Sequence, residues 1–310
     1  MTRATWTRSA FLLRVRMSTD ALFVLVEGVE LDRFFYDGLC RSSGRVVDAG
    51  HKIYLVESIK DEGTGSGAGG KGRLTRLFDY YRRRHALVQY SRAGKHSLLF
   101  CADRDAQDLS GGMRRSPHFL YTQNHDVEAD IFAAADAKQA LAALLSLDWA
   151  SAMELRTALG DWQEDLAVLW KGWIELCIIA QALNAHCGVT YKKMTSEVNS
   201  PTYGPVSLTK IVALRSQVIA VSGLSAAEFA KKEAGLMRRI ASRYSRSQGK
   251  TLAKGKWFPS YLEYRVRNEL GQKPASLHNF RPSVTRVFMN SVDFRGSWAD
   301  RVRASVEALL

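Results

Sequence analysis

The stretch "ALFVLVEG" at residues 21–28 constrains the fold most, because it is a continuous apolar run that ends in Glu27 and Gly28. Such a run is typical of a parallel strand that is buried on both faces. Further apolar runs follow at residues 51–58, 96–105 and 118–123, and helical patterns lie between them at 31–40 and 73–91. This order predicts an α/β domain with a mostly parallel sheet of about four strands and flanking helices.

From about residue 126 the sequence changes to long helical patterns rich in Ala and Leu. One continuous helix is expected over residues 161–188, ended by Gly188. Another begins at Ser225, with Glu228 at the spacing of a capping box. We therefore predict three parts: an N-terminal helical segment (1–19), the α/β domain (20–135) and a helical, basic C-terminal region (136–310).

The C-terminal half carries most of the excess positive charge. Residues 151–310 hold 23 Lys and Arg against 13 Asp and Glu, and the whole chain has a net charge of +13. Basic residues and aromatic residues alternate over 231–267, a mixture that favours nucleic acid because phosphates meet cations and unpaired bases stack on rings. The alternative is a solvated helix face above core aromatics. The candidate nucleic-acid-binding residues of this stretch are Arg238, Arg239, Arg243, Lys250 and Lys254. The interleaved aromatics are Tyr244, Trp257, Phe258 and Tyr261.

The cysteines and the apolar runs predict a cytoplasmic protein that makes no membrane contact. None of the four cysteines (Cys40, Cys101, Cys177 and Cys187) forms a C-x-x-C pair, which argues against a zinc site and a disulfide framework. The N-terminus lacks the long apolar core of a signal peptide. The most apolar run, 166–183, is interrupted by Lys171 and Glu175 and is therefore expected to be a buried helix.

The glycine run "GTGSGAGGKGR" (63–73) has the Gly-x4-Gly-Lys spacing of a nucleotide-binding loop at Gly65, Gly70 and Lys71. The next residue is Gly72, however, where magnesium binding requires Ser or Thr, and charged residues separate the run from the preceding strand. We interpret it as the connection to the next helix, in which Lys71 contacts a phosphate of nucleic acid rather than of ATP.

Acidic residues end two of the predicted strands. Glu27 ends the first, and Asp103 and Asp105 end the third. Ligands of open parallel sheets bind at this edge, so the three carboxylates converge if these strands are neighbours. Asp103 and Asp105 are two residues apart and would point to the same side of an extended segment. Converging carboxylates need a cation, and Mg²⁺, or alternatively Mn²⁺, fits them and promotes displacement at phosphorus. The alternative for each acid alone is a solvated loop residue or a helix N-cap.

Asp126 and Glu128 follow the fourth predicted strand. Either of them would add a metal ligand, or both would be acids that complement the N-terminus of a helix. His125 has the same two interpretations.

The ordered set "VLVEGVELDRFF", "GGKGRLTRL", "FCADRDAQD" and "LYTQNHDVEADIF" resembles the TOPRIM fold. In particular, it is similar to a TOPRIM-like family of unknown function whose genes neighbour ABC-type ATPases. This family looks related to the OLD-type nucleases and to the effector subunit of the PARIS phage-defence system. The later stretch "AKGKWFPSYLEYRV" resembles the family's Gly-Lys motif, and the resemblance spans roughly residues 20–270.

The resemblance assigns roles to individual residues. Glu27 corresponds to the catalytic glutamate, Asp103 and Asp105 to the metal-binding D-x-D motif, and Glu128 to the acid of the T-x(n)-E segment. Lys256, or else Lys254, corresponds to the late lysine that stabilises phosphate charge.

The resemblance also implies a magnesium-dependent endonuclease. The PARIS-like branch implies a toxic antiviral effector that cleaves RNA, in particular tRNA, is controlled by a partner ABC-type ATPase and acts as a homodimer. Two alternatives stay open: a DNA nuclease of the OLD type, and a non-catalytic subunit that binds nucleic acid or the ATPase.

Overall fold

Strand β1 (Leu22–Val26) lies in the middle of a sheet, and all five of its side chains are buried. The computed structural model describes residues 5–28, 31–60, 70–185, 187–191, 203–270, 277 and 279–310. In it, β2 (His51–Leu55) and β4 (Gly94–Ala102) flank β1, and both run parallel to it. The unbroken apolar run is explained by this position, because a central parallel strand is covered on both faces.

The sheet has five strands in the order β2-β1-β4-β3, with β5 also paired to β4. The long strand β4 pairs antiparallel with β3 (Val88–Ser91) along its first half and parallel with β5 (Phe119–Tyr121) at its end. The expectation of a mostly parallel sheet with flanking helices is therefore confirmed, with one additional antiparallel strand.

The additional strand corrects the helix that we expected over residues 73–91. Helix α4 (Gly70–Arg83) ends early because His85 adopts a left-handed conformation, with φ of 52°. The amide of Ala86 then donates back to the carbonyl of Tyr81, at 2.9 Å, which is the pattern of a helix-terminating Schellman motif. Because the helix ends here, the following residues form β3, which makes a hairpin with β4.

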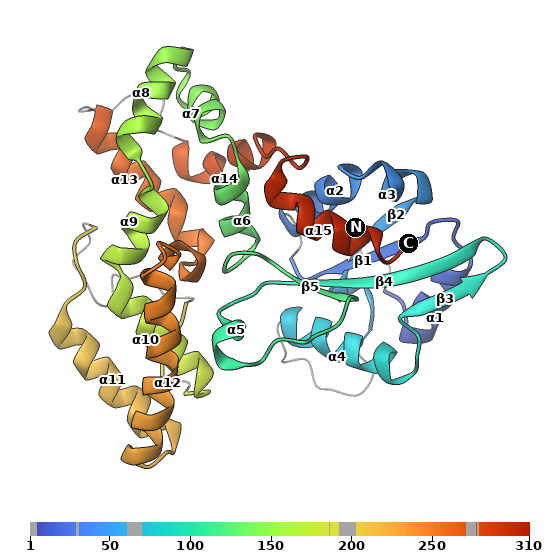
Figure 1. Ribbon diagram of the computed structural model, residues 1–310, viewed down its shortest axis with the longest axis horizontal. Coiled ribbons are helices and arrows are strands. Elements are labelled where there is room, and N and C mark those ends of the chain that lie inside the picture. Colours follow the sequence, from blue (N-terminus) through green and yellow to red (C-terminus); the bar gives the residue numbers. More distant parts are fainter. Residues whose placement is uncertain are drawn as a thin grey trace. The chain divides into compact units, whose positions relative to one another are not determined.

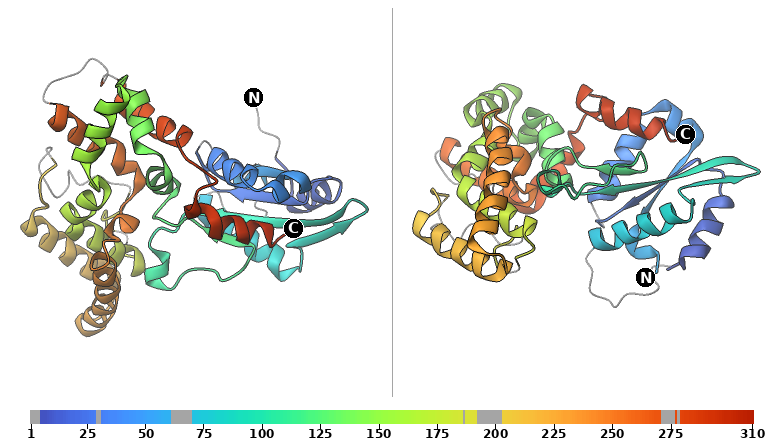
Figure 2. Two further views of the ribbon diagram at one scale, coloured as in Figure 1. Left: turned by 45° about the horizontal axis from the view of Figure 1, so that its top comes forward. Right: turned by 60° about the horizontal axis from the view of Figure 1, so that its bottom comes forward.

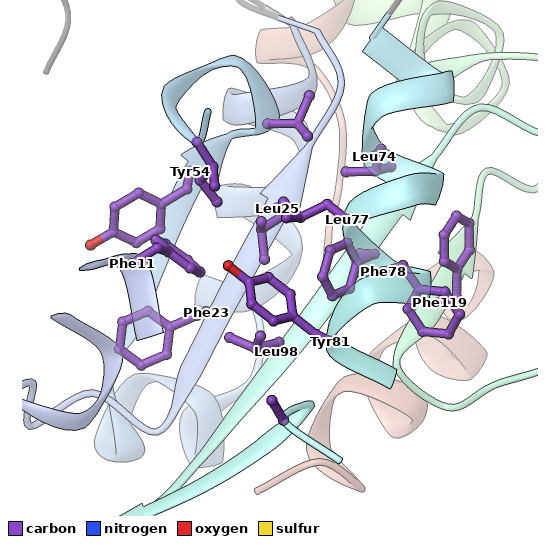
Figure 3. Packing of buried hydrophobic residues seen from close by; sticks show 14 of the residues in the cluster. Phe11, Phe23, Leu25, Tyr54, Leu74, Leu77, Phe78, Tyr81, Leu98 and Phe119 are labelled. Atoms are coloured by element: carbon purple, nitrogen blue, oxygen red, sulfur yellow. The ribbon is translucent and has the colours of Figure 1, made fainter. Parts of the chain in front are cut away.

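Helices cover both faces of the sheet (Figures 1 and 2). One face packs against α2 (Leu31–Arg41), α3 (Gly44–Ala49) and α15 (Asp300–Glu307), and the other against α1 (Arg8–Arg16) and α4. Short 3-10 helices occur at η1 (Val56–Ser58) and η6 (Ser297–Ala299). Figure 3 shows the core under α1 and α4, in which Phe11, Phe78 and Tyr81 belong to one cluster with Phe23 and Leu25 of β1.

The chain divides into two compact units. The sheet unit comprises Met1–Asp103, Arg114–Thr122 and Asp293–Leu310, and the helical unit comprises Arg104–Met113 and Gln123–Val292. The last residues of the chain, which the sequence groups with the helical region, thus pack in the sheet unit. There the Oγ of Ser97 donates to the carbonyl of Leu309 at 2.7 Å, which ties the C-terminus to β4.

The helical unit is built from short helices, several of which begin at an aspartate. Asp126, Asp136, Asp148 and Asp161 each accept a hydrogen bond from a backbone amide of the first turn that follows, as N-caps do. The bounds are α5 (Gln107–Ser110), α6 (Val127–Ala134), α7 (Ala137–Leu145), α8 (Trp149–Leu159), α9 (Trp162–Leu169), α10 (Lys171–Ala182), α11 (Leu208–Ser222), α12 (Ala226–Tyr244), η3 (Gly249–Leu252), η4 (Gly255–Trp257), α13 (Phe258–Leu270) and α14 (Phe280–Asn290).

The single helix expected over residues 161–188 is broken into α9 and α10. The break lies at Trp170, whose side chain is completely buried, stacks on Tyr203 and meets Trp257 edge-on. The spacing of apolar residues stays helical on both sides of Trp170, so the sequence does not show the break, which is visible only from the packing of the indole ring. The capping box at Ser225 and Glu228 is confirmed at the start of α12.

Among the described residues, no single helix is long and apolar enough to cross a membrane. One pair, α11 and α12, meets the length and hydropathy requirement only when the two are taken together, and they are bent by 118° relative to each other.

Candidate functional site

Glu27 and Asp103 follow the carboxyl ends of two adjacent parallel strands of the sheet unit. The register pairs Val26 of β1 with Cys101 of β4, so the two acids come one and two residues beyond this pair. The condition that the first and third predicted strands are neighbours is therefore met. In an open parallel sheet, this is the edge at which ligands bind.

The N-terminus of α4 lies against Glu27. A Cβ atom placed on Gly70, the first residue of α4, would lie only 2.5 Å from Cγ of Glu27. The next residue, Lys71, donates a short hydrogen bond from Nζ to the backbone carbonyl of Asp103. The end of the glycine run thus lies beside Glu27 and the backbone of Asp103, whereas residues 63–69 lie outside the described part of the chain.

This arrangement combines opposite charges. The carboxylate of Glu27 is half-buried beside the partial positive charge of a helix N-terminus. The ammonium of Lys71 is held at the strand end that carries Asp103. A hard cation would be attracted by the two carboxylates, and a phosphate by the lysine and the helix terminus.

Asp105 does not continue the strand, which corrects the expectation that it points to the same side as Asp103. Strand β4 ends at Ala102, and Asp105 and Ala106 both adopt left-handed conformations, with φ of 49° and 53°. The amide of Asp105 donates to the carbonyl of His125 at 2.8 Å. The chain leaves the extended conformation here and passes into the helical unit.

Glu128 and Lys256 meet within the helical unit, although 128 positions separate them in the sequence. The Nζ atom of Lys256 lies 3.7 Å from Oε1 of Glu128, and the lysine side chain is 64% exposed. The resemblance predicts both residues as site residues.

A buried contact brings this pair together. The amide of Gly255 donates to both carboxyl oxygens of Asp126, at 3.0 and 3.2 Å, and Asp126 also accepts from the amide of Ala129 at 2.9 Å. No side chain fits at Gly255, where a Cβ would lie 2.2 Å from the nitrogen of Ala129. Glu128 stands in the first turn of α6, directly beside this contact.

Burial raises the pKa of Asp126 well above its usual value, the nearby charge of Glu128 raises it further, and the two amide donors act in the opposite direction. The helix N-terminal interpretation of Asp126 and Glu128 is therefore confirmed. What the sequence did not indicate is the role of Gly255. The only signal for it is its place before the predicted Lys256.

His125 is buried beside the same loop. Its Nε2 atom lies 3.9 Å from Oδ1 of Asp105, and its ring centroid lies 4.3 Å from that of Tyr191. The imidazole therefore supports the turn that carries Asp105.

Several predicted phosphate ligands have partners within the helical unit. Lys250 pairs with Asp161 at 2.6 Å and Arg243 with Asp108 at 2.7 Å. Arg239 donates to the carbonyl of Leu109, whereas Arg238 is exposed. Lys254 is half-buried, near the carboxyl group of Asp126.

The aromatic residues of this stretch do not form a stacking surface. Trp257, Phe258 and Tyr261 are between 1% and 5% exposed, and the hydroxyl of Tyr244 donates to the carbonyl of Ala167 at 3.0 Å. The interpretation of these rings as stacking partners for bases is therefore wrong. They fill the core beneath a basic surface, as the alternative held.

No three His, Cys, Asp or Glu side chains gather as a metal-binding group within the described ranges. Of the four predicted ligands, Glu27 and Asp103 lie in the sheet unit, and Asp105 and Glu128 lie in the helical unit. The four cysteines are free thiols, and three of them are buried.

A search with protein-family models found no family that matches this sequence, and a search of curated proteins found no match.

Proposed function

We propose that this chain is a magnesium-dependent nuclease, and that Glu27 and Asp103 are its metal ligands. One observation carries the proposal: these acids stand at the ends of adjacent parallel strands, against the N-terminus of α4 and the ammonium of Lys71. The donor set fits Mg²⁺, which prefers a few carboxylate oxygens, retains water and takes further oxygens from phosphates. When bound, the ion would supply a Lewis acid at the phosphate.

The residues of the chain have separate tasks in this proposal. Glu27 accepts or holds a proton at its carboxylate when it is not occupied as a ligand. Lys71 and the first amides of α4 attract the phosphate. The role of Lys256 in stabilising negative charge stays a prediction from the resemblance. Asp105 and Glu128 as further ligands stay a prediction.

The narrower parts of the proposal are supported by the sequence resemblance and not by a contact in the structure. These parts are RNA, in particular tRNA, as substrate, a cytoplasmic antiviral effector, a homodimer and control by a partner ABC-type ATPase. The net charge of +13 agrees with a polyanionic substrate.

The direct test compares Glu27→Gln and Asp103→Asn with the wild-type protein. Purified protein is incubated with total RNA and with plasmid DNA, each with Mg²⁺ and with EDTA, and the cleaved ends are sequenced. We expect Mg²⁺-dependent cleavage that both variants lose. Cleavage of DNA alone would favour the OLD-type alternative. A folded wild-type protein that cleaves neither and binds no Mg²⁺ in calorimetry would favour the non-catalytic subunit.

A glycine pair isolates the position of Glu27. Gly70→Ala would push the Glu27 side chain away from α4. A displacement of a catalytic group by about 1 Å costs on the order of 100-fold in rate. Its matched control is Gly44→Ala, because Gly44 also begins a helix of the sheet unit and a Cβ there would meet nothing within 4 Å. Equal cleavage by the two variants would show that Glu27 does not act from this position.

A further inference from the structure

Helix α12 carries a dense row of cations along one side. With 100° of rotation per residue, all of these cations fall within an arc of roughly 140°. The row runs for about 18 Å along the helix between its first and last helical members and continues into the following turn. Its members are Lys231, Lys232, Arg238, Arg239, Arg243 and Arg246.

Two adjoining grooves follow this row. One, of about 510 Å³, lies between α12 and α5 and is lined by Asp108, Leu109 and arginines of the row. The other, of about 580 Å³, continues past Leu183 and Leu236 to the two lysines. Gly235 and Arg239 line both, so the grooves form one surface, which we call the α12 surface.

The acids around the α12 surface are already engaged. Asp108 pairs with Arg104 at 2.6 Å and with Arg243 at 2.7 Å. Glu233 is bound by Arg215, and Glu228 caps the helix through Ser225 at 2.7 Å. The field of the surface is therefore positive, and a polyanion fits it.

Among the described residues that line the two grooves there is no aromatic side chain. Proteins that hold single strands combine a basic groove with rings on which the bases stack, whereas phosphate contacts alone carry no sequence information. The rings nearest in sequence are those of Phe229, which is 1% exposed, and Tyr244, whose hydroxyl donates to the carbonyl of Ala167 at 3.0 Å. A surface of this composition can hold a sugar-phosphate backbone but offers no aromatic ring on which unpaired bases stack.

We infer that the α12 surface binds the phosphate backbone of a nucleic-acid duplex, such as a stem of folded RNA, without reading its sequence. The inference rests on the proposed function for the choice of nucleic acid as the polyanion. It adds that substrate is recognised by its helical backbone, at a surface that contains none of the carboxylates proposed for catalysis.

The test measures binding in EDTA, where no metal-dependent cleavage takes place. Fluorescein-labelled RNA duplex, DNA duplex and single strand of one sequence are titrated by anisotropy at several salt concentrations. The variant is Arg238→Glu with Arg246→Glu, and the control with the same change of charge is Arg156→Glu with Arg301→Glu. Arg156 and Arg301 are exposed on α8 and α15.

We expect the wild-type protein to bind duplex at least as tightly as single strand. The α12 variant should lose at least about tenfold in duplex affinity, and its plot of log K against log salt should flatten by about two, because each phosphate contact contributes about 0.9 to the slope. The control should bind as the wild type does. The two duplexes distinguish RNA from DNA as the source of the backbone.

Three results would overturn the inference: duplex binding by the α12 variant at wild-type strength, a clear preference of the wild type for single strand, or no binding of nucleic acid at all. The last would leave an acidic protein surface as the occupant. Circular dichroism establishes that the variants fold. Because Glu27→Gln should lose cleavage and keep duplex binding, failure of the inference and failure of the proposed nuclease are distinguishable.

Discussion

Gly255→Ala should be among the most destabilising single substitutions in the helical unit. A Cβ at this position would lie 2.2 Å from the nitrogen of Ala129 and 2.5 Å from Oδ1 of Asp126. The nitrogen belongs to the backbone of α6 and cannot rotate away, so η4 or α6 must shift. The shift would also separate the Gly255 amide from the Asp126 carboxyl, which it now meets at 3.0 and 3.2 Å.

Two terms set the magnitude. Overpacking of a close contact costs about 1–3 kcal/mol. Leaving a buried carboxyl short of a donor costs about a further 1–3 kcal/mol. The free energy of unfolding should therefore fall by roughly 2–6 kcal/mol, a large part of the total for an ordinary domain. Urea denaturation followed by tryptophan fluorescence measures this loss, because Trp170 and Trp257 are buried in the same unit.

Gly235→Ala is the matched control. Gly235 lies inside α12, and a Cβ there would meet nothing within 4 Å. Alanine should stabilise the helix by about 0.5–1 kcal/mol, so the same substitution should have opposite signs at the two positions. If Gly255→Ala unfolded at the urea midpoint of the wild-type protein, or moved it upward as Gly235→Ala should, the contact between η4 and α6 would be refuted.

Three further predictions concern groups elsewhere in the chain. Iodoacetamide should modify the half-exposed Cys187 first, as mass spectrometry of the native protein would show, and fast labelling of a buried thiol would contradict the packing. Burial raises the pKa of the other three thiols, those of Cys40, Cys101 and Cys177, and that of Cys40 rises to about 12. Lys256→Met should change the free energy of unfolding by less than about 1 kcal/mol, because the lysine side chain of its ion pair with Glu128 is 64% exposed, yet lower cleavage on the order of 100-fold. Burial acts to raise the pKa of Asp37, but hydrogen bonds from Arg41 and His51 outweigh it and lower this pKa below the usual 3.8. Asp37→Asn should therefore cost below about 1 kcal/mol at neutral pH, and the difference from wild type in urea titrations should vanish as the pH falls below 3.8 and through the folded pKa; a difference that grew in acid would contradict the ion pair.

The folded structure explains why a basic stretch with aromatics has two interpretations in sequence. On α12 the cations and the apolar side chains occupy different arcs of one helix. The basic residues and the apolar residues of this stretch therefore both recur at helical spacing. Beyond the helix, Trp257 and Phe258 follow Lys254 and Lys256 directly, but their rings point into the core while Lys256 is exposed. Sequence order alone does not distinguish a ring beneath a basic surface from a ring upon it.

The local patterns of the sequence determined the four parallel strands, the acids that follow them and the first turns of several helices. Burial of β1 on both faces follows from its apolar run, and the capping box of α12 follows from Ser225 and Glu228, because these interactions join residues at most a few positions apart. The placement of Glu27 and Asp103 after adjacent strands depended on one further condition, that β1 and β4 pair.

Only the tertiary structure decided that pairing, the early end of α4, the break at Trp170 and the turn at Asp105. It also brought Gly255 to Asp126, across 129 positions of the chain. Each of these features depends on a partner that is remote in sequence: an edge of β4, an aromatic cluster, a carbonyl of His125 or a buried carboxyl group. The spacing of apolar residues and the secondary-structure propensities of a sequence describe one helix or strand at a time. They therefore carry no information about which remote groups will meet.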